Sequence, residues 1–437
     1  MHSEKILCDV RILTIFRLKL HCFLSIILNM LPCQRHLFSL PDNVHYLNCA
    51  YMSPLLKSVE EAGVFGVQRK RLPYIMSSED FFSLPLETRS LFAELVNAPG
   101  AGSISLLPSV SYGMATVAKN LRIADGQNIV SVAGEFPSNV YAWKNLINNS
   151  SVDLRLVKSP IEWHNSDFIN DATNSENADY LEKHPPTRGE VWNEMILDAI
   201  DDNTALVVLC PLHWADGTLF DLETIGDAAR AVGAMFVIDG TQAIGAMPID
   251  VQRLKPDALI AASYKCMMGA YSIGCAYWGN RFLEGKPLEE TWIGRVGSSD
   301  FRNLVNYQDE YQGEMDRYNM GEQSNFVLVP MLHAAITQLL EWGPEQVQEY
   351  CKKLTQPLIR YCADANFWVE EAHWRTDHLF GIRIPDHLAL DKLQEALARR
   401  NVFVSLRGDS IRVSPNVYNT EEDIMALIDA LNDAKSV

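Results

Sequence analysis

Alternating apolar and polar stretches run through the middle of the chain and predict a regular exchange of helices and strands. Short apolar runs are typical of buried strands, and longer segments with apolar positions every three or four residues are typical of helices. Strands are predicted at Ile104–Leu107, Asn128–Val132, Leu154–Val157, Ala205–Leu209, Met235–Ile238, Leu259–Ala262 and Gly274–Tyr277. Helices are predicted at Pro85–Ala98, Tyr112–Leu121, Asn139–Ile147, Val191–Ile200 and Leu222–Val232, the last between an Asp221 cap and Gly233. This order predicts an α/β fold with a mostly parallel, seven-stranded sheet.

The last third of the chain has a different pattern, with longer helices and fewer strands. Helices are predicted at Pro330–Trp342 and Pro344–Asn366, then a strand, a helix at Leu388–Arg400, a second strand and a helix after Thr420. We therefore predict a large domain over 61–305 and a smaller α+β C-terminal domain over 306–437, which residues 30–60 join. The polar stretch 159–189 is interpreted as a surface insertion in the large domain.

The first 29 residues resemble a signal peptide only superficially. Basic residues precede the apolar run Cys22–Leu28. That run is shorter than the roughly 20 residues that span a bilayer, and no small-residue cleavage pattern follows it. We interpret residues 1–29 as a non-native or disordered extension and Met30 as the natural start.

Composition and charge exclude several classes of partner. The 437 residues are 48% hydrophobic, which is enough for a large core, and their formal net charge is -18. Binding a nucleic-acid backbone requires a basic surface, so this charge argues against it. The nine cysteines form no C-x-x-C pair and have no metal-like spacing with histidine. We expect a cytoplasmic protein that binds no nucleic acid, membrane or metal.

Lys265 and Asp239 are the first candidates for chemistry. Asp239 directly follows one predicted apolar strand, and Lys265 lies just beyond the next. A lysine amine can bond an aldehyde as a Schiff base, and a carboxylate at the end of an apolar strand needs a cationic partner. A protonated pyridine nitrogen supplies that partner, so the pair predicts pyridoxal 5'-phosphate as the cofactor.

Two further loops follow predicted strands, where ligands of open α/β sheets gather. Ser109 and Ser111 begin a helix, whose free N–H groups and their hydroxyls can bind a phosphate. Phe136 is held by a following proline and can lie flat on a pyridine ring. Taken singly, these residues are equally typical of a serine cap and a core phenylalanine. Their occurrence in successive loops with Asp239 and Lys265 favours one shared site.

Five more residues fall close enough in sequence to join this site. Gln242 can reach a ring hydroxyl on the side of the preceding aspartate, and Ser263 and Tyr264 can touch phosphate. His213 and Trp214 follow another predicted strand and are candidates to face the cofactor ring oxygen. A packing role for these last two is an equal alternative.

The motifs Asp239-Gly-Thr-Gln242 and Ser263-Tyr-Lys265 resemble those of the class V aminotransferase family of fold-type I pyridoxal phosphate enzymes. The family includes cysteine desulfurases, kynureninases and isopenicillin N epimerases, and the resemblance extends from about Val44 to the C-terminus. It implies a PLP-dependent transferase fold, with Lys265 as the Schiff-base lysine and Asp239 as the partner of the pyridine nitrogen.

The same resemblance implies roles for other positions. Val110 and Ser111 match the phosphate loop, while Phe136 and Tyr264 resemble the stacking phenylalanine and the phosphate tyrosine of kynureninases. Trp292 falls where such enzymes bring a residue to the phosphate from a second subunit. The resemblance therefore implies a homodimer with a shared active site.

Residues near the C-terminus match the family's substrate-carboxylate segment. Arg412 is the candidate clamp on the carboxylate of an L-amino acid, with Arg407 assisting and Asn48 lining the same pocket. Desulfurases carry a nucleophilic cysteine between the two arginines, but here that interval is only Gly408–Ile411, and no cysteine follows Cys362. We therefore predict an aminotransferase or a Cα/Cβ lyase.

Other functions remain open at this point. Within the family, the alternatives are a cysteine desulfurase and an epimerase-type enzyme. From another class, the alternative is a non-catalytic partner protein that retains the PLP fold. Lys265, Asp239 and Arg412 argue against it, because a scaffold has no physical need for all three.

Overall fold

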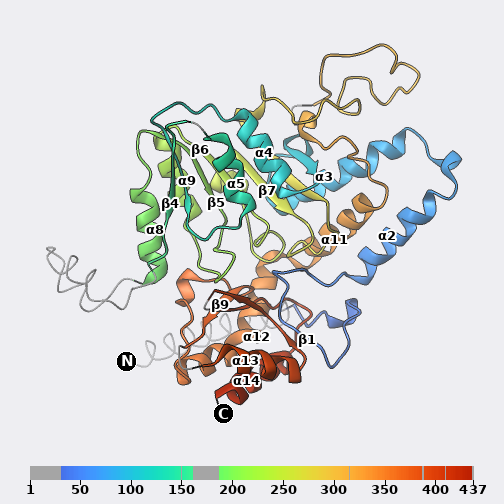
Figure 1. Ribbon diagram of the computed structural model, residues 1–437. Helices are drawn as coiled ribbons and strands as arrows, with labels where there is room; N and C mark the ends of the chain where they lie inside the picture. The colour runs from blue at the N-terminus through green and yellow to red at the C-terminus, as the bar shows by residue number, and fades with distance from the viewer. Residues whose placement is uncertain are drawn as a thin grey trace, which may run out of the picture.

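The computed structural model describes residues 31–148, 150–160, 187–313, 315–385, 388–408 and 410–435. A large part with a central sheet lies above a smaller part that carries the C-terminal helices (Figure 1). The predicted extension 1–29 and most of the predicted insertion, residues 161–186, lie outside the described residues.

One seven-stranded sheet organises the large part, in the order β2-β8-β7-β6-β5-β3-β4. β8 runs antiparallel to both of its neighbours, and the other pairings are parallel. The strands are β2 (Ile104–Leu107), β3 (Asn128–Val132), β4 (Asp153–Val157), β5 (Thr204–Leu209), β6 (Met235–Asp239), β7 (Ala258–Ala262) and β8 (Gly274–Trp278). The sheet confirms the predicted α/β class.

Helices cover both faces of this sheet, which is why its central strands are continuous apolar runs. Every residue of β5, β6 and β7 is buried. Along β5, Leu206 and Val208 belong to one core cluster, and Val207 and Leu209 belong to another. The helices of the large part are α2 (Lys57–Arg69), α3 (Ser83–Leu95), α4 (Val110–Asn120), α5 (Ser138–Leu146), α8 (Arg188–Asp198), α9 (Leu222–Ala231) and α10 (Val251–Leu254).

Local capping explains where two of these helices begin. The Asp221 side chain accepts a hydrogen bond from Thr224 N at 3.1 Å, which confirms the predicted cap of α9. α8 begins at Arg188, three residues before the predicted start and inside the stretch predicted as an insertion. The reason is a capping box, in which Thr187 and Glu190 satisfy each other's backbone N–H groups.

The C-terminal part contains α12 (Pro344–Asp364), α13 (Leu390–Arg399) and α14 (Glu421–Lys435). These helices pack on an antiparallel sheet of order β11-β12-β9, made of β11 (Ser405–Arg407), β12 (Ser410–Val413) and β9 (Phe380–Arg383). The N-terminal β1 (His45–Tyr46) pairs in parallel with β10 (Val402–Phe403). α11 (Leu328–Trp342) packs instead on α2 and α3 of the large part.

None of the helices in the described ranges is both long enough and apolar enough to span a membrane.

Candidate active site

A cavity of about 240 Å³ lies where the carboxyl ends of the parallel strands meet. β8 runs the other way, so the residues just before its start reach the same edge of the sheet. The cavity is lined by Pro108, Ser109, Val110, Ser111, Phe136, Ser138, Cys210, Trp214, Asp239, Thr241, Gln242, Ala262, Tyr264, Lys265, Tyr271, Ser272 and Ile273. The structure thus brings most of the predicted cofactor residues into one cavity.

Lys265 places its amine deep in this cavity. The side chain is only 7% exposed, and its Nζ lies 5.2 Å from the ring centroid of Phe136 and 5.5 Å from that of Tyr264. Burial lowers the pKa of Lys265, an effect that Asp239 opposes and Arg412 reinforces. A larger share of the amine is therefore neutral, and able to accept a proton, than on an exposed lysine.

Asp239 ends β6 with its carboxylate held on both oxygens. Asn139 Nδ2 donates to Oδ2 at 2.7 Å, and the backbone N–H of Thr241 donates to Oδ1 at 3.0 Å. These two donors fix the carboxylate plane at the cavity wall. Asn139 was not among the predicted site residues, although it stands three residues after Phe136.

The polar groups around the cavity fit pyridoxal phosphate. Gln242 donates from Nε2 to Ala50 O at 3.2 Å, and its Oε1 is buried without a partner in the protein, which suits a ring hydroxyl. Ser109 caps α4 by accepting from Tyr112 N at 3.1 Å. The N–H groups that open α4 after it, at Val110 and Ser111, form an anion site.

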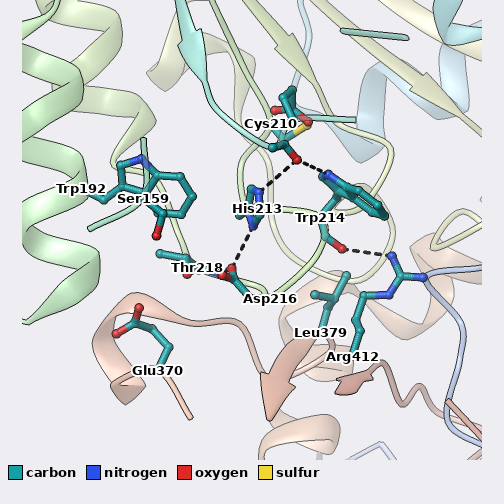
Figure 2. Close-up of polar contacts among 12 residues, drawn as sticks. Ser159, Trp192, Cys210, His213, Trp214, Asp216, Thr218, Glu370, Leu379 and Arg412 are labelled. Atoms are coloured by element: carbon teal, nitrogen blue, oxygen red, sulfur yellow. Dashed lines mark hydrogen bonds and ion pairs between the residues drawn. The ribbon is translucent and has the colours of Figure 1, made fainter. Parts of the chain in front are cut away.

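Trp214 lines this cavity and also contacts Arg412, one of the predicted substrate residues (Figure 2). Its Nε1 donates to Gly134 O at 2.7 Å, and its ring packs edge-on against Phe136 with centroids 5.6 Å apart. Its own carbonyl accepts from Arg412 Nη1 at 3.0 Å. The residue is therefore held both through its indole nitrogen and through its backbone carbonyl, and its ring forms one wall of the cavity.

Arg412 and Arg407 lie next to Trp214, on neighbouring strands of the β11–β12 hairpin. Their Cζ atoms are 5.8 and 5.5 Å from the Trp214 ring centroid, respectively. Arg412 is 1% exposed and donates to Ser405 Oγ at 3.4 Å, and Ser405 donates to Asn48 Oδ1 at 2.8 Å. Burial and then Arg407 lower the pKa of Arg412 to about 10, so it stays cationic at neutral pH. Neither arginine forms an ion pair with a carboxylate of the described residues, which leaves both available to an anion.

Two predicted cofactor residues have other positions. The hydroxyl of Ser263 is fully buried and donates to Ala270 O and Ile273 O, so it holds the loop before β8 and does not face the cavity. His213 lies behind the wall, where it contacts a neighbouring carboxylate. Trp292 is 43% exposed and packs edge-on against two phenylalanines outside the cavity of its own chain, so its predicted contact with the phosphate of a second subunit stays a prediction.

Several cavity residues were missed by the sequence analysis. Tyr271 and Ser272 precede β8, and only the antiparallel direction of that strand brings them to the site. The rings of Tyr271 and Tyr264 lie 4.6 Å apart and form one aromatic side of the cavity. Cys210 directly follows β5, and a search of every strand end would have found it.

The sequence is similar to a known family and to several known proteins. The family model for aminotransferase class-V matches residues 164–427. An uncharacterised aminotransferase, YcbU, of Bacillus subtilis is 23% identical over 78% of this chain and 82% of its own length. A probable cysteine desulfurase of Methanothermobacter thermautotrophicus is 23% identical over 79% of this chain and 82% of its own length.

Solved structures show the same fold. A cysteine desulfurase from Thermococcus onnurineus superimposes with a TM-score of 0.72 at 19% identity, covering 92% of this chain and 98% of its own. A variant of C-DES with glycine covalently linked to its PLP cofactor reaches a TM-score of 0.75 at 17% identity, covering 92% and 99%. This chain belongs to the class-V aminotransferase family, whose enzymes depend on pyridoxal phosphate.

Proposed function

We propose that this chain is a pyridoxal phosphate-dependent aminotransferase or Cα/Cβ lyase that acts on an L-amino acid. The observation that carries the proposal is the placement of the Lys265 amine and the Asp239 carboxylate in one buried cavity. Arg412 is held by the carbonyl of Trp214, a residue that lines this cavity, so its guanidinium is placed to bind the substrate carboxylate. Family membership supports the class of enzyme, and the geometry supports the role of each residue.

Asp239, Gln242 and the start of α4 would hold the cofactor at three different points. Pyridoxal phosphate, when bound, supplies an electron sink for charge that develops on the α-carbon. The Asp239 carboxylate stabilises a proton on the ring nitrogen, Gln242 Oε1 accepts from the ring hydroxyl, and the N–H groups of α4 bind the phosphate. Phe136 and Trp214 exclude water from one side of the cavity.

Lys265 would move the proton that decides the reaction. Its lowered pKa favours the neutral amine, so Nζ can accept a proton from the substrate α-carbon. With the cofactor bound, release of that proton by Nζ at a carbon other than the α-carbon would give transamination. Loss of a leaving group from the side chain leads instead to elimination, and the same lysine serves both.

The described cysteines argue against an enzyme-bound persulfide. The Arg407–Arg412 hairpin has no thiol, and Cys210 is the one cysteine among the described residues that line the cavity. Its thiol donates to Glu135 Oε1 at 3.4 Å. Burial, followed by Glu135, raises the pKa of Cys210 well above its ordinary value, which suppresses the nucleophilic thiolate. The cavity position of Cys210 nevertheless keeps a cysteine desulfurase as the second candidate.

A substrate panel separates these two candidates. Purified holoprotein is incubated singly with L-alanine, L-cysteine, cysteine sulfinate and L-kynurenine, and keto acid, ammonia and sulfide are measured. We expect keto acid from at least one substrate, with no sulfur left on the protein. Mass spectrometry after turnover with L-cysteine is the deciding measurement, because a persulfide on Cys210 supports the desulfurase. Absence of any product from the holoprotein with a broad panel contradicts both.

We also propose a homodimer, because large apolar side chains are exposed on two segments, 65–76 and 292–307, that meet at one cavity. The apolar surface is made of Phe65, Tyr74, Trp292, Val305 and Tyr307, of which Tyr307 is 94% exposed. A cavity of about 660 Å³ connects its two halves, since it is lined both by the segment after α2 and by Trp292. Such surfaces on soluble proteins usually mark an interface. A second copy seated there would cover Trp292, as the family resemblance implies.

Sedimentation equilibrium tests the homodimer. We expect twice the chain mass at micromolar concentration, and a dissociation constant raised at least about tenfold by Tyr307→Glu, because a charge would be buried at the interface. Met425→Glu is the matched control, since Met425 is an exposed apolar residue on α14 and lies outside the apolar surface. A monomer with full activity contradicts the proposal.

A further inference from the structure

A chain of ion pairs and hydrogen bonds lies close to Trp214, and the proposed mechanism gives it no role. Arg188, at the start of α8, donates to Asp216 Oδ2 at 2.8 Å and to Glu370 Oε2 at 2.8 Å. Asp216 Oδ1 contacts His213 Nδ1 at 3.1 Å. Figure 2 shows His213 between this carboxylate and a backbone carbonyl, which is that of Gly134. These contacts thus connect the start of α8 to the loop that contains Gly134 and Phe136.

Both ring nitrogens of His213 face groups that can only accept. Asp216 also accepts from the backbone and hydroxyl of Thr218, at 3.1 and 2.9 Å, as an ionised carboxylate does. The second nitrogen, Nε2, lies 3.3 Å from Gly134 O, and a carbonyl oxygen has no hydrogen to give. A neutral imidazole has one N–H and leaves one of these contacts without a proton. Only the imidazolium, which has an N–H on each ring nitrogen, can donate to both Asp216 Oδ1 and Gly134 O.

The Gly134 carbonyl is a shared anchor of the cavity wall. It accepts from His213 and also from Trp214 Nε1, at 2.7 Å. Gly134 has a φ of +76°, a conformation that few other residues adopt, so this turn is specific to its position. Two residues further on is Phe136, whose ring faces Lys265. Loss of the His213 bond would therefore loosen both aromatic walls together.

The charged groups around His213 favour its protonated form on balance. Burial disfavours the imidazolium, but the Asp216 carboxylate outweighs burial and raises the pKa of His213. Glu135, in the loop before α5, acts in the same direction, and Arg188 on α8 acts against it. The pKa of Asp216 is lowered in turn, because His213 and Arg188 outweigh its own burial.

We infer that His213, as an imidazolium, is a positioning residue that holds the Gly134 loop and so sets Phe136 and Trp214 around the cofactor. The inference rests on the proposed function for its consequence, and on the two contacts of His213 for its geometry. Because the folded pKa is raised, this contribution is complete below the unfolded pKa of about 6.5. It is lost as the pH rises through the folded value.

His378 is an internal control, because its contacts favour the neutral ring whereas those of His213 favour the imidazolium. It is also buried, but its Nδ1 faces the Gln348 Nε2 amide donor at 2.7 Å, while its Nε2 faces Gln242 O at 2.7 Å. One donor and one acceptor satisfy a neutral ring. Accordingly, burial lowers the pKa of His378 to about 4.

Nitrogen NMR of histidine side chains in the cofactor-free protein tests the charge directly. At pH 7 we expect one buried histidine to be an imidazolium and a second, His378, to be neutral, with the first resonance absent in His213→Gln. Its titration midpoint should lie above 6.5. A neutral His213 at pH 7 overturns the inference. This result does not depend on cofactor binding, so it stands apart from any failure of the proposed function.

Two isosteric variants then test the positioning role in the holoprotein. His213→Gln retains a donor at the place of Nε2, and His213→Asn retains one at the place of Nδ1 only. We expect the glutamine variant to keep pyridoxal phosphate affinity within about threefold while losing the alkaline dependence of that affinity. The asparagine variant should lose at least tenfold at every pH. Equal affinity and an unchanged pH profile in both variants refute the role.

Discussion

Lys265→Ala is expected to abolish both the visible absorbance of the bound cofactor and turnover. The substitution removes the amine that we propose bonds the cofactor and moves the α-proton, and both proposed roles depend on the buried Nζ. Loss of general acid–base catalysis alone costs about 10² to 10⁴-fold in rate, so kcat should fall at least about a thousandfold. The measurement is the absorbance spectrum before and after borohydride, which should bleach the wild-type band.

Lys353→Ala is the control for this experiment. Lys353 is exposed on α12, and its removal should leave spectrum and turnover unchanged. The assignment of Lys265 is refuted if the alanine variant keeps a band that borohydride bleaches. Thermal unfolding of both variants checks that a lost band reflects lost chemistry and not a lost fold.

Arg412→Lys is expected to raise KM about 10- to 100-fold while the cofactor spectrum stays unchanged. Lysine keeps the charge but loses the planar fork that binds both oxygens of a carboxylate. Hydrogen bonds to charged groups contribute about 1.5–3 kcal/mol, which corresponds to this range. Arg412 also donates to the Trp214 carbonyl, so a smaller fall in kcat is expected from a less rigid wall.

Arg360→Lys is the matched control, because Arg360 is exposed on α12 and donates only to Gln356 O. Steady-state kinetics with the best substrate from the panel gives both constants. An unchanged KM in Arg412→Lys would indicate that the substrate carboxylate binds at Arg407 instead. Circular dichroism is needed beside the kinetics, because Arg412 is buried.

The large sheet shows which features of the fold apolar patterning predicts and which it does not. Runs such as Ile104–Leu107 and Asn128–Val132 have the predicted bounds, because a strand buried on both faces is mostly apolar and stands out from its polar flanks. Asp239 and Lys265 were found for the same reason, since a charged group at the end of such a run needs a partner. The pattern does not reveal strand direction, and the reversal of β8 is what brings Tyr271 and Ser272 to the cavity.

Helix α2 was not predicted, and its two glycines explain why. Gly63 and Gly66 lower the helix propensity of an isolated segment. In the folded protein, a Cβ on Gly66 would lie 2.2 Å from Phe326 O, and one on Gly63 would lie 2.7 Å from Met331 Sδ. The glycines therefore permit α2 to approach the start of α11 closely. Packing between segments far apart in the chain stabilises this helix, although its own sequence has a low helix propensity.

The sequence by itself determined the α/β class and the cofactor, and it predicted Lys265, Asp239 and Arg412 as site residues, because each depends on local pattern or on residue chemistry. The tertiary structure alone decided that Trp214 is a wall and that His213 lies behind it, bonded at both nitrogens. Those roles depend on Gly134, which is some eighty residues away in the chain. Hydrogen bonds over that separation have no periodic trace in a sequence, and only the folded chain shows them.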